Sequence, residues 1–226
     1  MRCRTLFVDA GGVIIDPDWE RVASILGRRG IAVPAAALAA AEPAAKRAID
    51  VAPSRSGADD RRRGGLFFTA VARGAGIDLP DEADLVAEHA RRNLWSVIPP
   101  GAPEALDRLR AAGVGLVLVS NAAADLPAFL GELDLARRFD HLVVSGIVGI
   151  EKPDPGIFRE ALRISDADPA SVIHVGDLYE IDVVGARSAG LRGALIDPTG
   201  TRTDADCPRF PSLAAAADAV IAARGG

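Results

Sequence analysis

The stretch TLFVDAGG, residues 5–12, is an apolar run that ends in an aspartate and two glycines. Continuous runs of Val, Leu and Ile are typical of parallel strands that are buried on both faces. Four more runs of this kind follow: VGLVLVSN (114–121), HLVVSG (141–146), SVIHVGD (171–177) and GALID (193–197). Together they predict the strands of one parallel sheet.

Amphipathic segments lie between these runs and predict helices. They are PEALDRLRAAG (103–113), DPGIFREALRI (154–164), YEIDVVGARSAG (179–190) and a last helix that Ser212 caps and that runs through Ala223. The first of them ends at Gly113, a residue suited to the C-terminal end of a helix. Strands that alternate with helices predict an α/β fold with a doubly wound parallel sheet.

Residues 17–97 interrupt this alternation, because they contain helical patterns and no strand-like run. The expected helices are 19–29, a stretch that starts at Pro34, 65–76 and 81–95, with Asp18 and Asp81 as helix starts and Pro43, Pro53 and Pro80 as breaks. We therefore predict a helical subdomain at 17–97, inserted into an α/β core domain formed by 1–16 and 98–226.

Length, charge and composition exclude several functions. The 226 residues can form one large α/β domain with a small accessory domain, and a net charge of −5 gives no support to nucleic-acid binding. The apolar runs are too short for a signal peptide or a membrane span, so we expect a cytoplasmic protein without a membrane partner. Cys3 and Cys207 are far apart in sequence and are expected to be free thiols.

Polar residues stand where the predicted strands end. Asp9 follows the first strand, Ser120 and Asn121 end the second, and Lys152 lies in a proline-flanked loop before the fourth. Asp177 ends the fourth strand, and Asp182 follows it by five residues. Each one alone has an ordinary explanation as a turn former, a helix cap or a surface charge. In open parallel sheets, however, ligands bind beyond the carboxyl ends of the strands, so the whole set predicts one site.

This set of side chains suits phosphoryl transfer. Asp9 offers a nucleophilic carboxylate, and Asp9 and Asp177, with a backbone carbonyl, are oxygen ligands of the type that Mg²⁺ prefers. Asp182 is expected to reach the metal directly or through a water. Ser120, Asn121 and Lys152 are expected to bind and fix the transferring phosphoryl group.

The chain resembles the haloacid dehalogenase superfamily, in the branch with a helical cap after the first strand. The resemblance rests on FVDAGGVIID (7–16), VLVSNA (117–122), GIEKPDPGIF (149–158) and, most specifically, HVGDLYEIDVVGARSAGL (174–191). It implies a Rossmann-like core, a Mg²⁺-dependent aspartyl-phosphate intermediate and a cap that closes over a small phosphorylated metabolite.

The sequence departs from the family pattern at one position. Most phosphatases of the family have a second aspartate two residues after the nucleophile, where this chain has Gly11. Gly11 can offer its backbone carbonyl to the metal, but it cannot act as the general acid and base, a role that typically contributes about 10²–10⁴-fold in rate. Asp16 is a possible surrogate, and Glu20 and His89 are weaker ones.

Three functions remain open on these residues. A phosphatase with an unusual acid is the prediction, as a monomer or homodimer. A 2-haloacid dehalogenase needs no acid because halide leaves unprotonated, but Asp177 and Asp182 together favour a metal-dependent enzyme. A non-hydrolysing relative that binds a phosphorylated ligand or a protein partner is the third.

Several other residues have a structural interpretation. His174 lies within the fourth strand, and we interpret it as a packed core histidine. Trp19, Phe67, Phe68 and Trp95 are interpreted as the core of the cap, with the lining of a substrate pocket as the alternative.

Overall fold

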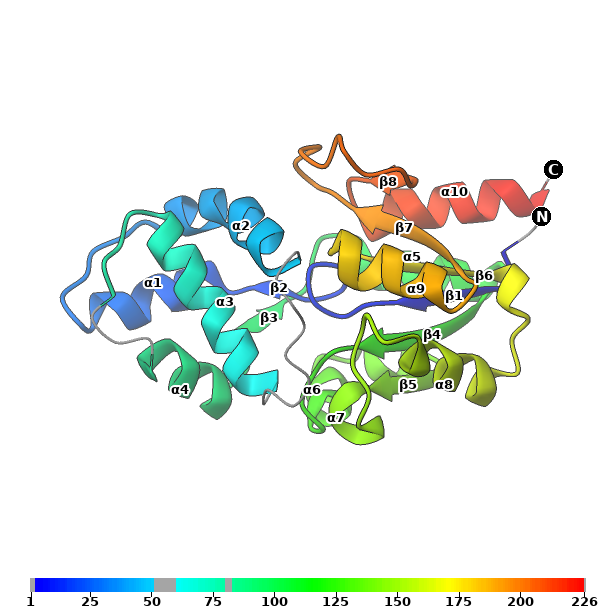
Figure 1. Ribbon diagram of the computed structural model, residues 1–226, viewed down its shortest axis with the longest axis horizontal. Coiled ribbons are helices and arrows are strands. Elements are labelled where there is room, and N and C mark those ends of the chain that lie inside the picture. The colour runs from blue at the N-terminus through cyan, green and yellow to red at the C-terminus, as the bar shows by residue number, and fades with distance from the viewer. Residues whose placement is uncertain (1–2, 51–59, 80–82, 226) are drawn as a thin grey trace. The chain divides into compact units, whose positions relative to one another are not determined.

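The computed structural model describes residues 3–50, 60–79 and 83–225. The chain divides into two compact units, one formed by Met1–Ile15 and Ile98–Gly226 and the other by Asp16–Val97. Asp16 thus falls in the second unit, one residue away from the boundary expected from the sequence. Figure 1 labels the helices and strands of both units.

The first unit contains a six-stranded sheet in the order β5-β4-β1-β6-β7-β8. Its strands are β1 (Thr5–Val8), β4 (Gly115–Ser120), β5 (His141–Val144), β6 (Val172–Gly176), β7 (Arg192–Ile196) and β8 (Arg209–Phe210). Every neighbouring pair is parallel. The predicted α/β class is therefore confirmed, and β1 lies between β4 and β6 in the centre of the sheet.

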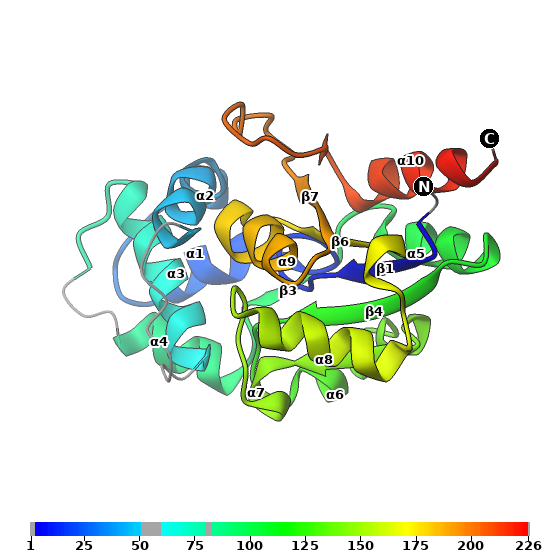
Figure 2. The same cartoon turned by 45° about the vertical axis from the view of Figure 1, so that its right-hand side comes forward.

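Side chains on both faces of this sheet are buried, as the apolar runs predict. On one face, Phe7, Val117 and Val143 pack with Ile157 and Phe158 from helix α8 (Pro155–Ser165). Figure 2 shows α8 lying along β4. Leu6 and Val8, which point to the other face because side chains alternate along a strand, are also fully buried. The sheet is thus covered on both sides.

The helices of the first unit follow the expected positions closely. Helix α5 (Ala102–Ala111) is followed by Gly113 at φ +71°, whose N–H donates to Arg110 O at 2.9 Å. The N–H of Val114 donates to Leu109 O at 3.0 Å, so the helix ends in the glycine motif that the sequence predicts. Helix α10 (Leu213–Gly225) packs against α5. Asp154 caps α8 by accepting a hydrogen bond from the Gly156 N–H at 2.7 Å.

The structure adds short elements that the sequence patterns do not reveal. These are α6 (Leu126–Glu132), α7 (Ser145–Val148), the 3₁₀ turns Ala136–Arg138 and Pro169–Ser171, and strand β8. The helix expected over 179–190 consists of a π-helical segment, Tyr179–Val184, followed by the short helix α9 (Gly185–Ser188). Strand β8 has two residues, and α6, the longest of the missed helices, has seven, so none of them is long enough to show a clear hydrophobic period.

The second unit is helical, with one small strand pair. Its helices are α1 (Trp19–Gly27), α2 (Ala35–Asp50), α3 (Asp60–Gly74) and α4 (Ala83–Arg91). Asp18 caps α1, as expected, by accepting the Arg21 N–H at 2.9 Å. The prediction for Asp81 lies outside the described residues, as do those for Pro53 and Pro80.

Two expectations for this unit were wrong. Strands β2 (Asp16–Pro17) and β3 (Trp95–Val97) form an antiparallel pair where the sequence indicated only helices. Helix α4 ends at Arg91 because the half-buried His89 accepts the Leu94 N–H at its Nδ1, at 3.2 Å, and so turns the chain into β3. Helix α2 also continues through Pro43, where we expected a break.

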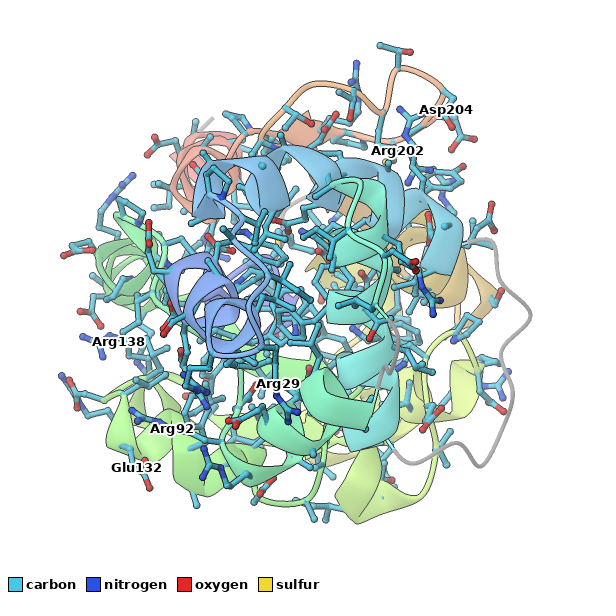
Figure 3. All side chains as sticks on the ribbon, turned by 90° about the vertical axis from the view of Figure 1, so that its left-hand side faces the viewer. Arg29, Arg92, Glu132, Arg138, Arg202 and Asp204 are labelled. Atoms are coloured by element: carbon cyan, nitrogen blue, oxygen red, sulfur yellow. The ribbon has the colours of Figure 1, made fainter. Side chains whose placement is uncertain are left out.

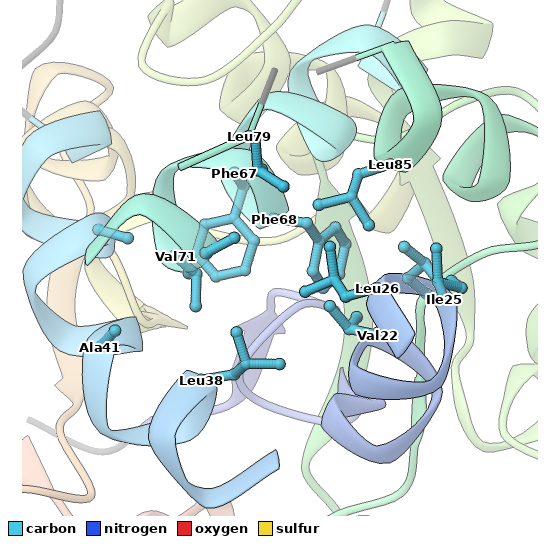
Figure 4. Close-up of a cluster of buried hydrophobic side chains, with 13 residues drawn as sticks. Val22, Ile25, Leu26, Leu38, Ala41, Phe67, Phe68, Val71, Leu79 and Leu85 are labelled. Atoms are coloured by element: carbon cyan, nitrogen blue, oxygen red, sulfur yellow. The ribbon is translucent and has the colours of Figure 1, made fainter. Parts of the chain in front are cut away.

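The hydrophobic core of the second unit is built around aromatic side chains. Phe67 and Phe68 contact each other at 5.2 Å between ring centroids and pack among Val22, Leu26 and Leu38 (Figure 4). Trp19 and Trp95 extend the group, with Trp95 lying 5.0 Å from Phe67 and Trp19 lying 5.7 Å from Phe68. The four aromatic residues therefore form the core that the sequence interpretation favours. No helix within residues 3–50, 60–79 and 83–225 has the length and apolar character that crossing a membrane requires.

Candidate active site

Asp9 stands at the carboxyl end of β1, at the middle of the sheet. Its backbone N–H donates to Val175 O of β6 at 2.9 Å, which continues the sheet pairing to the last residue before the turn. Its side chain is mostly buried, and its Oδ1 accepts the N–H of Ala10 at 2.7 Å. The sheet and this local hydrogen bond therefore fix the carboxylate that the sequence predicts as the nucleophile.

Lys152 contacts two carboxylates with one buried ammonium group. Its Nζ lies 2.9 Å from Asp9 Oδ1 and 2.6 Å from Asp182 Oδ1, and the residue is only 2% exposed. Burial by itself lowers the pKa of Lys152, but attraction by Asp182 and Asp9 outweighs it, so the pKa is raised above its usual value. The two carboxylates therefore favour the charged form of Lys152 beside Asp9.

Asp182 is fully buried and also binds the ammonium group of Lys152. Its Oδ1 accepts hydrogen bonds from Lys152 and from His174 Nε2, and its Oδ2 accepts the Leu178 N–H at 2.9 Å. Burial opposes the charge, but Lys152 and His174 stabilise it, and the pKa of Asp182 lies well below the usual value. Asp182 is the ionised counter-charge of Lys152.

Gly176 makes this arrangement possible. A Cβ atom at this position would lie 2.1 Å from Asp182 Cγ, a distance that no packing adjustment of a fixed carboxylate allows. The glycine before Asp177 thus leaves the space at the end of β6 into which Asp182 folds back.

The side-chain amide of Asn121 binds the backbone of Lys152. Its Oδ1 accepts the N–H of Lys152 at 2.7 Å, and its Nδ2 donates to the C=O of Lys152 at 2.9 Å. The amide thus holds the loop at the point where Lys152 enters the site, and the expected contact of Asn121 with phosphate stays a prediction. Ser120, its neighbour, is buried at the end of β4.

Three carboxylates converge at this edge of the sheet. Oxygen atoms of Asp9, Asp177 and Asp182 all lie within 4.8 Å of one another. Oxygen ligands in such a group are of the chemical type that hard divalent cations prefer. Asp177 is half-buried directly after β6, and Asp9 is mostly buried directly after β1.

The two residues linked to the missing acid lie at either end of the turn after β1. Gly11 forms an isolated bridge with Ile15 in the first unit, and its role as a carbonyl ligand stays a prediction. Asp16 begins the second unit. Its pKa is raised, chiefly by burial and further by the Glu42 charge, although the Lys46 charge opposes this shift. A raised pKa suits a general acid, and the role of Asp16 as the surrogate acid stays a prediction.

The sequence profile of the haloacid dehalogenase-like hydrolase family matches residues 3–190, which span all of the side chains described above. The chain belongs to this family. The resemblance seen in the four motifs is thereby confirmed.

Curated relatives of this haloacid dehalogenase-like hydrolase include two that inform its chemistry. It is 35% identical over 130 residues to human haloacid dehalogenase-like hydrolase domain-containing protein 3, covering 58% of this chain and 51% of that protein. It is 40% identical over 134 residues to phosphoserine phosphatase of Thermus thermophilus, and this match covers 58% of this chain and 53% of that protein. These matches span about half the length of the curated relatives.

Among solved structures, the magnesium-bound HAD-hydrolase YfnB of Bacillus subtilis has a TM-score of 0.72 to this chain. The match covers 97% of this hydrolase and 99% of that chain at 20% sequence identity. At this identity the likeness concerns the fold, which is the α/β fold predicted from the sequence.

Sequence reasoning missed part of the hydrolase site. The interpretation of His174 as a packed core residue is confirmed, because it is fully buried against Phe158, but its Nε2 also lies 3.1 Å from Asp182 Oδ1. The signal was present, because a polar ring within a fully buried strand needs a hydrogen-bond partner. Ser145 was missed as well; its hydroxyl accepts the Ala122 N–H at 3.0 Å and so shapes the loop that follows Asn121.

A second network lies beside the π-helical segment that contains Asp182. Asp197, which follows β7, accepts the N–H groups of Thr201 and Arg202 at 3.1 and 3.0 Å. The guanidinium of Arg202 lies 5.3 Å from the ring centre of Tyr179, the first residue of the π-helical segment. Figure 3 shows Arg202 and Asp204 on this loop. The loop after β7 is thereby fastened to the segment that positions Asp182.

Proposed function

We propose that this protein is a Mg²⁺-dependent phosphatase that hydrolyses a small phosphorylated metabolite of the cytoplasm, a phosphoric monoester, through an aspartyl-phosphate. The observation that supports it best is the buried Lys152 ammonium, shared by Asp9 and Asp182 at the carboxyl ends of β1 and β6. A cation fixed beside a nucleophilic carboxylate suits a reaction in which a dianionic group must approach an aspartate.

The proposed reaction proceeds in two steps. An Asp9 oxygen attacks phosphorus in line, the new P–O bond forms as the bond to the leaving oxygen breaks, and an aspartyl-phosphate results. Water then attacks phosphorus and releases inorganic phosphate and the free Asp9 carboxylate. Lys152 and Ser120 stabilise the phosphoryl oxygens in both steps, and Asn121 keeps Lys152 in place through its backbone.

The donor set fits a magnesium ion. Asp9 and Asp177 would hold it, with the Gly11 carbonyl as a further oxygen ligand. Asp182 would contribute through a water, because each of its oxygens already accepts hydrogen bonds from protein groups. When bound, the ion supplies positive charge to the phosphoryl oxygens.

The relatives support this choice of chemistry. The Thermus thermophilus relative is a phosphoserine phosphatase, and the Bacillus subtilis hydrolase structure contains magnesium. Because the curated matches span only about half of each relative, the proposal extends to the class of phosphate monoesters and not to phosphoserine itself.

Hydrolysis of p-nitrophenyl phosphate with Mg²⁺, and again with EDTA, tests the proposal. We expect metal-dependent turnover that Asp9→Asn abolishes. Asp166→Asn is the matched control, since Asp166 has φ +49°, a conformation that asparagine also tolerates, and full activity is expected. Chloride release from 2-chloropropionate without metal would instead identify a dehalogenase. Tight phosphate binding with no turnover of any phosphate monoester would identify a binding protein.

A further inference from the structure

His174 is a polar side chain in the centre of an apolar layer. It lies on β6 between Phe7 of β1 and Gly193 of β7, and it is fully buried. Its ring packs edge-on against Phe158 of α8, with centroids 5.0 Å apart and planes at 74°. Burying a polar ring is unfavourable unless its nitrogen atoms are hydrogen-bonded, so its contact with Asp182 is the one that offsets this burial.

The surroundings of the two ring nitrogens define the tautomer. Nε2 lies 3.1 Å from Asp182 Oδ1, whereas the buried Nδ1 has no hydrogen-bond partner among the residues that the structure describes. An ionised carboxylate only accepts hydrogen bonds, so Nε2 must donate. A proton on Nδ1 would leave a buried N–H without an acceptor, which is unfavourable. The neutral ring with hydrogen on Nε2 satisfies both conditions.

The hydrogen bond from His174 acts on the atom that also binds Lys152. Asp182 Oδ1 receives Lys152 Nζ at 2.6 Å and His174 Nε2 at 3.1 Å, while the Leu178 N–H holds Oδ2. These donors together fix the plane of the carboxylate. Without His174, Oδ1 would have Lys152 as its one donor, and the ammonium would be drawn toward Asp182 and away from Asp9.

We propose that His174 is a positioning residue: it donates from Nε2 to Asp182 and thereby keeps the Lys152 ammonium shared between Asp182 and Asp9. The structural part of this proposal stands on the contacts alone. Its kinetic consequence rests on the proposed phosphatase function, because it requires that Lys152 stabilise a phosphoryl group.

The first test needs no turnover. The chain contains three histidines, so ¹⁵N-labelled histidine gives few signals, and those of His174 are the ones missing from His174→Gln. At neutral pH we expect Nε2 to be protonated and Nδ1 to be unprotonated in the full-length wild-type protein. A ring that carries its hydrogen on Nδ1 and none on Nε2 would overturn the proposal even if the protein proves to be an efficient phosphatase.

The second test compares three variants by kcat for p-nitrophenyl phosphate and by the inhibition constant of inorganic phosphate. His174→Phe keeps an aromatic ring against Phe158 but removes the donor, and His174→Gln retains an N–H donor. Phe158→Leu disturbs the same core without touching Asp182. The inhibition constant does not depend on how much of the enzyme is folded, so it separates positioning from stability.

We expect His174→Phe to lower kcat by about 10- to 100-fold, the range typical of partners that orient catalytic groups, and to raise the phosphate inhibition constant. His174→Gln should recover most of both losses, and Phe158→Leu should leave the inhibition constant unchanged. If kcat and the phosphate inhibition constant of His174→Phe both stay within two-fold of wild type, the positioning role is overturned. It is also overturned if Phe158→Leu raises the inhibition constant as much as His174→Phe does. If wild type fails to turn over any phosphate monoester, the proposed function fails, and the NMR measurement still decides whether His174 donates to Asp182.

Discussion

The side-chain amide of Asn121 makes two hydrogen bonds, and both go to the backbone of Lys152. Asn121 follows β4, and Lys152 lies in the loop before α8, so this amide joins two separate segments at the carboxyl end of the sheet. Lys152 is thus positioned twice, by Asn121 at its backbone and by Asp182 at its ammonium group.

Replacement of Asn121 should therefore lower stability as well as activity. In Asn121→Ala, the N–H and C=O of Lys152 both lose their partners, and we expect a loss of about 1–3 kcal/mol in the free energy of unfolding, with reduced kcat. Urea unfolding and p-nitrophenyl phosphate turnover measure the two effects. Asn93→Ala is the control, because it removes one hydrogen bond to Trp95 in the second unit and should spare kcat. A normal free energy of unfolding in Asn121→Ala, with weakened phosphate binding, would instead indicate a direct phosphate ligand.

Removal of the Lys152 charge should destabilise the fold through the carboxylates it leaves behind. We expect Lys152→Met to lose roughly 3–5 kcal/mol, and a second change, Asp182→Asn, to restore part of this stability but no activity. The contribution of Asp182 is fully present above the unfolded pKa of about 3.9 and is lost as the pH falls through its lowered folded pKa. The difference between wild type and Lys152→Met should therefore shrink in acid. Strictly additive losses in the double variant would show that the two residues are not coupled.

Gly176 should tolerate no side chain. The methyl group of Gly176→Ala would meet Asp182 Cγ, so we expect a loss of more than about 3 kcal/mol in the free energy of unfolding, together with loss of activity. Gly131→Ala is the matched control, since a Cβ on this residue of α6 meets nothing within 4 Å. Alanine favours a helix over glycine by about 1 kcal/mol, so that control should become slightly more stable. Equal stability of the two variants in urea would contradict the packing argument.

Asp16 should make stability depend on pH in the opposite sense to Asp182. Burial raises its folded pKa, so its contribution is present below the unfolded pKa of about 3.9 and is lost as the pH rises through the folded value. Asp16→Asn should therefore be more stable than wild type at neutral pH, and this gain should vanish in acid. Asp18→Asn serves as the control because asparagine caps a helix as well as aspartate does. Thermal unfolding of both variants from pH 4 to pH 8 measures their stability relative to wild type. A gain in the stability of Asp16→Asn that persists at pH 4 would be inconsistent with titration of Asp16.

Gly11→Asp should supply the general acid that the first motif lacks. Alkoxide leaving groups need protonation far more than p-nitrophenolate does, so turnover of alkyl phosphates should rise more than that of aryl phosphates, by up to about 10²-fold. If Asp16 is the surrogate acid, Asp16→Asn should produce the reverse pattern in the same pair of assays. Unchanged or reduced rates for both substrate classes in Gly11→Asp would show that the missing acid does not limit this enzyme.

Much of the architecture could be predicted from short stretches of sequence. Apolar runs such as LFV in β1 and GLVLV in β4 have one stable arrangement, burial on both faces of a parallel sheet, and the polar residue after each run then lies at the ligand-binding edge. Strands β2, β3 and β8 were missed because two or three residues show no hydrophobic period.

The sequence by itself determined the fold class, the family and the presence of Asp9, Lys152, Asp177 and Asp182 at one site, because these depend on hydrophobic patterns and motif order. Only the tertiary structure decided which atoms meet. The Asn121 amide binds the backbone of Lys152, and His174, a buried core residue, also lies against the Asp182 carboxylate. The physical reason is that β4, β1 and β6 are neighbours in the sheet but distant in the chain, and the pairing of their buried donors and acceptors is settled by side-chain geometry within a few ångströms.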